Sequence, residues 1–162
     1  MKRLLFLGLL MCMCFAYGQD IIGQIALEDL KKEPFDEWFN TEYENYAPFG
    51  KTIAQLEGLQ KDIAITVFMG TWCSDSQMHV PAFFRILDAL AFSGEVQIIG
   101  ADRDKKTPTG SATNNGITNV PTFIFYKEGK EVHRIVESPV EFLEDDMLAI
   151  LSGAAYKHTY EN

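Results

Sequence analysis

The sequence predicts an α/β domain built on a mixed sheet with helices on both faces, and three observations predict it. The run 63–69 (IAITVFM) is almost continuously apolar and β-branched, which is typical of a central strand covered on both sides. A long segment of helical periodicity and a second apolar run at 96–101 follow it, as in a parallel β-α-β unit. The runs 122–126 and 131–137, joined by a Lys-Glu-Gly-Lys turn, predict an antiparallel hairpin.

The first 18 residues are typical of a secretion signal. Two basic residues precede an apolar run from Leu4 to Phe15, which is too short to span a bilayer. Small residues at positions 16 and 18 predict cleavage before Gln19. We therefore expect export to the periplasm or the cell exterior, with no stable membrane insertion after signal removal. A lipoprotein is the weaker alternative, because methionines rather than small residues precede Cys12 and Cys14.

The remaining 144 residues are enough for one domain with its own core. We expect residues 19–60 to form a helical extension packed on that domain, and residues 61–155 to form the domain itself. Signal removal leaves 12 of the 14 basic residues against 23 acidic ones, a formal net charge of −11. This balance argues against nucleic acid and anionic membrane surfaces as partners. A monomer is expected.

Helical periodicity and proline positions predict the helices in order. Pro34 opens a helix whose aromatic face is expected to pack on the core: Phe35, Trp38, Phe39, Tyr43 and Tyr46. A second short helix is expected at 53–59, and a long one at 74–92 with Pro81 inside it. Pro139 opens the last helix. We interpret its acidic run, 144–146, as solvated helix surface.

The junction between the buried strand and the long helix carries the sequence Trp72-Cys73-Ser74-Asp75-Ser76, and here the chain resembles the thioredoxin family. Pro81 matches the kink proline of that family's helix, the segment 100–102 (GAD) matches a loop of the family, and 115–122 (NGITNVPT) matches the approach to its cis-proline. The resemblance covers about residues 62–151. It implies a thioredoxin-like three-layer α/β/α sandwich.

The main departure from the family lies in its redox motif. The usual Cys-x-x-Cys ends in Ser76, so the resolving thiol is missing. Cys73 is expected to be the nucleophile, with a hydrogen bond from Ser76; the helix N-terminus favours its thiolate and the Asp75 carboxylate opposes it. The resemblance also implies a substrate groove bordered by Trp72, Val120 and Pro121, where an extended partner would pair with the Val120 backbone beside a cis bond. Those three residues are the expected substrate-binding residues.

These features predict an exported monothiol thiol–disulfide oxidoreductase or isomerase. Its partners would be protein or small-molecule thiols and disulfides, with an external reductant supplying the resolving thiol. The alternative is a non-catalytic module of the same fold that binds proteins or peptides, and a buried, inert Cys73 also stays open. A peroxidase is weaker, since the threonine-containing approach to its cysteine is absent. No cofactor is expected, and no metal, because His79, His133 and His158 lack ligand spacing.

Overall fold

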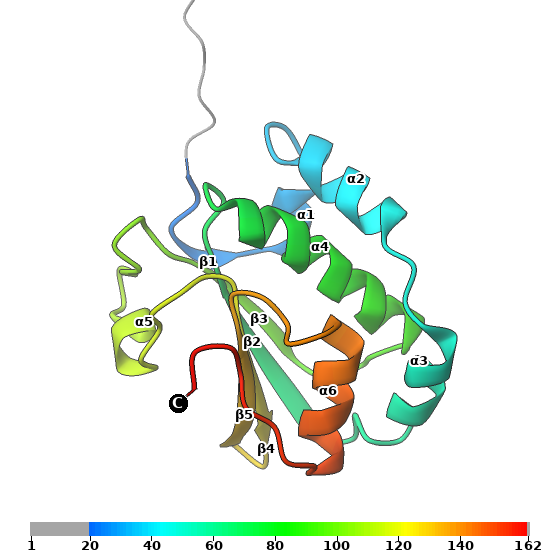
Figure 1. Cartoon of the computed structure of the whole chain (residues 1–162). Helices are drawn as coiled ribbons and strands as arrows, with labels where there is room; N and C mark the ends of the chain where they lie inside the picture. The colour runs from blue at the N-terminus through cyan, green and yellow to red at the C-terminus, as the bar shows by residue number, and fades with distance from the viewer. Residues whose placement is uncertain (1–19, 162) are drawn as a thin grey trace, which may run out of the picture.

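A single mixed sheet organises the protein, whose computed structural model describes residues 20–161 (Figure 1). The predicted signal and its cleavage site therefore lie outside the described residues. The strand order is β1-β3-β2-β4-β5, with β2 parallel to β3 and the other neighbours antiparallel. The strands are β1 (Gly23–Ile25), β2 (Ile63–Met69), β3 (Val96–Gly100), β4 (Thr122–Lys127) and β5 (Lys130–Val136). The predicted α/β class and mixed sheet are confirmed.

Six helices are found among residues 20–161, and they divide unequally between the two faces of the sheet. They are α1 (Leu27–Leu30), α2 (Asp36–Asn45), α3 (Gly50–Leu56), α4 (Ser74–Ala89), α5 (Ser111–Asn114) and α6 (Leu143–Ser152). Figure 1 shows α2, α4 and α6 along one side of the sheet and the short α5 on the other. Within the described part of the chain, none of these helices is long and apolar enough to cross a membrane.

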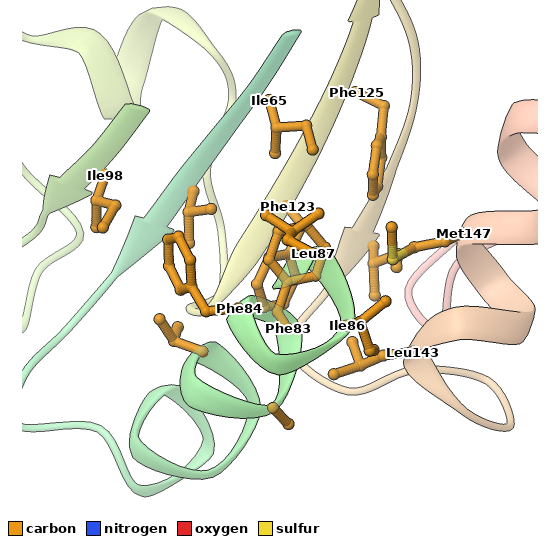
Figure 2. Close-up of a cluster of buried hydrophobic side chains, with 14 of the residues drawn as sticks. Ile65, Phe83, Phe84, Ile86, Leu87, Ile98, Phe123, Phe125, Leu143 and Met147 are labelled. Carbon is orange, nitrogen blue, oxygen red and sulfur yellow. The ribbon is translucent and has the colours of Figure 1, made fainter. Parts of the chain in front are cut away.

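The larger core lies between the sheet and the side that carries α4. Alternate residues of β2 point to this side because side chains alternate across a strand. Figure 2 shows α4 and α6 next to each other against the sheet. The ring of Phe83 on α4 lies tilted against that of Phe123 on β4, with a centroid distance of 4.5 Å. The aromatic face of α2 also packs here, as predicted: Phe39 is fully buried, and Trp38, Tyr43 and Tyr46 lie against the cluster. This core holds α4 in place, and α4 begins beside Cys73.

A smaller core occupies the opposite face of the sheet, under α5. It contains Phe68, Ile124 and Ala112, and it extends to Val120, all buried. The indole of Trp72 and the side chain of Cys73 pack against its edge. The turn after β2 and the approach to β4 therefore share one apolar support.

The N-terminal extension is not purely helical, which corrects the prediction for residues 19–60. It begins with β1, which pairs antiparallel with β3 and forms an edge of the sheet. Gly100 makes this possible, because a Cβ there would lie 2.0 Å from the carbonyl oxygen of Ile21. The strand was missed because it has only three residues, and its partner lies some 75 residues further along the chain.

The acidic run of α6 is largely buried, so its interpretation as solvated surface is wrong. Glu144 has no exposed surface and accepts hydrogen bonds from the Tyr46 hydroxyl and from the backbone N–H of Phe49, the latter at 2.9 Å. Asp146 is 4% exposed and accepts from the Tyr156 hydroxyl at 2.8 Å. The helix begins at Leu143, four residues after Pro139, so these carboxylates lie in its first turn, where the helix dipole favours negative charge.

Candidate functional site

Cys73 stands at the junction that brings both cores together. It is the last residue before α4, and its backbone N–H donates to the carbonyl of Gly70 at 3.0 Å, which closes the turn after β2. Its side chain is half-buried rather than sealed in the interior. The first backbone N–H groups of a helix have no intrahelical acceptor, so an anion at this position is stabilised. Cys73 therefore lies at a helix N-terminus, where the sequence predicted it, and it is half-buried there.

The sulfur of Cys73 has two polar contacts among the described residues. Its thiol donates to the carbonyl oxygen of Val120 at 3.2 Å, and a carboxylate oxygen of Asp75 lies 3.9 Å away. The peptide bond from Val120 to Pro121 is cis, as the resemblance implied. Two segments that are distant in sequence therefore meet at one sulfur: the start of α4 and the approach to β4.

The side chains of Val120 and Pro121 are both buried. Val120 is only 2% exposed with its backbone included, so the backbone that the resemblance implied for main-chain pairing is itself largely covered in the structure. The Val120 carbonyl already accepts the thiol hydrogen bond. A partner that reacts with Cys73 would release this carbonyl, because the sulfur loses its proton.

Trp72 borders the site and is fixed from three sides. Its indole N–H donates to the carbonyl of Ala101 at 2.9 Å, and the guanidinium of Arg103 lies 5.0 Å from the centre of the ring. Gly70 lies under the indole, where a Cβ would come within 2.5 Å of the ring. The absence of a side chain at Gly70 therefore decides where the tryptophan sits.

Ser76 does not bond to Cys73, contrary to the sequence expectation. The residue is fully buried, and its hydroxyl oxygen accepts the backbone N–H of Gly70 at 3.2 Å. Ser76 therefore ties the start of the turn after β2 to the first turn of α4. In the structure it is a positioning residue, and its hydroxyl is engaged by Gly70 rather than by the sulfur.

Two further residues shape this turn, and no sequence pattern pointed to them. The carbonyl of Thr71 accepts from the side-chain amide of Gln77 at 2.8 Å. The hydroxyl oxygen of Thr71 accepts the backbone N–H of Ile21 at 3.2 Å. The start of the extension is thus fastened directly to the turn that presents Cys73. Threonine and glutamine are common polar residues, so only the fold could reveal this role.

The three histidines do not converge on one site. His79 lies on α4, where burial lowers the pKa of its imidazole although the carboxylates of Asp75 and Glu42 act to raise it. His133 and His158 lie apart from it and share the carboxylate of Glu161, at 3.6 and 3.9 Å. Within residues 20–161, no group of three ligand-type side chains could hold a metal ion.

The sheet order, the cysteine before α4 and the carbonyl that precedes a cis-proline beside its sulfur together define a class of redox fold. Comparisons with known proteins agree. A sequence profile described as thioredoxin matches residues 28–149. A thioredoxin of Gallus gallus is 30% identical over 98 residues, covering 60% of this chain and 89% of that protein. A thioredoxin-like protein of Synechocystis sp. is 30% identical over 87 residues, covering 54% and 78%.

A solved structure supports the fold independently of close sequence similarity. A protein of unknown function from Pseudomonas aeruginosa superposes with a TM-score of 0.56 at 19% identity, over 74% of this chain and 82% of that one. The profile match spans more than half of the sequence. The chain belongs to the thioredoxin family. Membership indicates a thiol–disulfide redox function, since the family generally acts on protein thiols and disulfides.

Proposed function

We propose that the protein is an exported monothiol thiol–disulfide oxidoreductase or isomerase, with Cys73 as its nucleophile. One observation carries the proposal: Cys73 is half-buried at the N-terminus of α4, and its sulfur lies 3.2 Å from the backbone oxygen of Val120. That oxygen belongs to the segment where an extended partner would pair. The site therefore combines a reactive position with a place to hold a substrate.

The reaction follows from this arrangement in two exchange steps. The Cys73 thiolate attacks one sulfur of a partner disulfide; that bond breaks, a mixed disulfide with Cys73 forms, and the other partner sulfur leaves as a thiolate that takes up a proton. An external thiol then attacks the mixed disulfide and returns Cys73 to its reduced form. The N-terminal N–H groups of α4 favour the anionic sulfur both as attacking and as leaving group.

The requirement for an external thiol has two supports. Cys73 is the only cysteine after position 14 of the sequence. Ser76 occupies the place of the resolving cysteine, has no thiol, and is held by Gly70. A mixed disulfide on Cys73 therefore has no internal route to resolution.

The exported location is part of the same proposal. Its support is the N-terminal signal pattern, with cleavage before Gln19. An unpaired thiol in an oxidising compartment forms mixed disulfides with other molecules, which suits the proposed chemistry. A cell fractionation that finds the protein in the cytoplasm with residues 1–18 intact would contradict this part alone.

The alternative function is a non-catalytic module that binds extended peptides. Two contacts favour it: the Cys73 thiol is engaged by the Val120 carbonyl, and Ser76 is committed to the turn. Both functions use the same groove. They differ only in whether Cys73 turns over.

The deciding assay measures turnover of a disulfide substrate by the mature protein, residues 19–162, with glutathione in excess. We expect turnover that is lost to the uncatalysed rate in Cys73→Ser. The matched control is Ser74→Ala, which alters an exposed hydroxyl next to Cys73 and should retain turnover. Equal rates for the mature protein and Cys73→Ser would overturn the oxidoreductase and leave the binding module.

A further inference from the structure

The carboxylate of Asp75 is the charged side chain in contact with the reactive sulfur. Its Oδ2 lies 3.9 Å from the sulfur of Cys73, and the residue is half-buried in the first turn of α4. A substrate disulfide must approach that same sulfur, so groups next to the scissile bond pass close to this carboxylate. At such separations one unit charge appreciably changes the energy with which a charged substrate approaches the site, even in a medium of high dielectric constant.

We propose that Asp75 sets the substrate class of Cys73, selecting disulfides flanked by cationic groups over those flanked by anionic groups. This inference rests on the proposed function, because it concerns the exchange reaction at the same sulfur. A cation next to the disulfide is attracted by the carboxylate and also offsets the repulsion between the carboxylate and the forming thiolate. An anion next to the disulfide adds a second repulsion.

The other charged groups near the site do not cancel this preference. Arg103 lies over the Trp72 ring, and no contact joins it to the sulfur among the described residues. Burial lowers the pKa of His79, so its imidazole is neutral above pH 7. The net charge of the whole chain is also negative, −9 before signal removal, so long-range steering has the same sign as the local effect.

The test uses three small disulfides that differ in charge: cystamine with two ammonium groups, bis(2-hydroxyethyl) disulfide with none, and dithiodiglycolate with two carboxylates. In each case the Cys73 thiolate attacks one sulfur, the reagent's S–S bond breaks, and the released half leaves as a thiolate that is then protonated. Intact-mass measurement of quenched samples gives the rate of adduct formation on Cys73. The informative quantity is the ratio of the cystamine rate to the dithiodiglycolate rate.

This ratio is compared between the mature protein and Asp75→Asn. Any effect of Asp75 on the ionisation of Cys73 changes both rates equally and cancels in the ratio. Intrinsic reactivity of the reagents cancels between the two proteins. We expect the ratio to fall about tenfold in Asp75→Asn. This magnitude follows if the charged groups of the reagents lie roughly 7 Å from the Asp75 carboxylate in a medium of high effective dielectric constant. Arg103→Gln should raise the ratio, because it removes a positive charge.

The matched control is Glu95→Gln, which removes an exposed carboxylate just before β3. Because β2 and β3 are parallel, and Cys73 follows the last residue of β2, Glu95 lies at the opposite end of these strands from Cys73. Its ratio should match that of the unmodified protein within about twofold. An unchanged ratio in Asp75→Asn would overturn this inference and leave the proposed function standing. Failure of all three reagents to modify Cys73 would overturn both.

Discussion

Removing the buried carboxylate of Glu144 should destabilise the fold strongly, because this group joins the extension to the last helix. It accepts from the hydroxyl of Tyr46, which follows α2, and from the N–H of Phe49, which precedes α3. Burial and the bond to Glu144 raise the pKa of the Tyr46 phenol, so it remains a proton donor throughout the physiological range. The carboxylate has no exposed surface, so water cannot replace either bond easily.

The expected loss follows from these two bonds. A hydrogen bond to a charged group contributes about 1.5–3 kcal/mol, and a buried donor left without an acceptor costs about 1–3 kcal/mol. Glu144→Ala removes both acceptors and should lower the free energy of unfolding by about 3–5 kcal/mol. Tyr46→Phe keeps the ring and removes one bond, so it should cost about 1.5–3 kcal/mol.

The assay is chemical denaturation of the single variants and of the double variant, followed by circular dichroism. The double variant should lose less than the sum of the single losses, by at least about 1 kcal/mol, since both residues make the same bond. Asp29→Ala is the control, because its ion pair with Lys32 at 3.4 Å is exposed and should contribute at most about 1 kcal/mol. Additive losses, or a Glu144→Ala loss as small as the control's, would refute this reasoning.

Three further outcomes are expected at and near the site. Gly70→Ala should displace the indole of Trp72, because the new methyl group would lie 2.5 Å from the ring. We expect a shift in tryptophan fluorescence and a free energy of unfolding lower by about 1–3 kcal/mol. An unchanged fluorescence spectrum would contradict this. Ser76→Cys should form an internal disulfide with Cys73 under oxidation, which intact mass shows as the loss of two hydrogens. The variant should also need less external thiol for turnover. A variant that stays a dithiol under oxidation would argue against this. Burial lowers the pKa of His79, so this side chain binds a proton less readily in the folded protein than in the unfolded chain. Its contribution to the stability of the fold is therefore fully present above about pH 6.5, and it should be lost as the pH drops through the folded pKa. His79→Gln should lose less stability than the unmodified protein between about pH 7 and pH 5, as measured by denaturation midpoints, and equal losses would contradict this.

The central strands could be predicted from sequence because a buried strand needs a continuous run of apolar residues. The run 63–69 is apolar at every position but one, and β2 has these same bounds. The edge strand β1 has no such run, since Gly23 and Gln24 are not β-branched apolar residues. Its pairing with β3 is also long-range, so no local pattern indicates it. Local composition thus predicts the middle of the sheet better than its edge.

The acidic run of α6 shows the same limit for polar residues. Glu144 and Asp146 follow the pattern of a solvated helix surface, but both are buried, and each accepts a hydrogen bond from a tyrosine: Tyr46 of the extension and Tyr156 just after α6. At the site, the position of Cys73 and its closeness to Val120 followed from the resemblance to the family. The role of Ser76 did not, because the Gly70 N–H competes for its hydroxyl and only the folded turn shows which contact wins.

The central claim is that Cys73 exchanges disulfides with partner molecules in the compartment where the protein works. The most direct measurement isolates disulfide-linked adducts of the protein from intact cells after rapid acid quenching, and identifies them by mass spectrometry. We predict adducts joined through Cys73 that disappear on reduction and are absent in Cys73→Ser. Recovery of the protein only as the free thiol, with none of its population in mixed disulfides, would contradict the account.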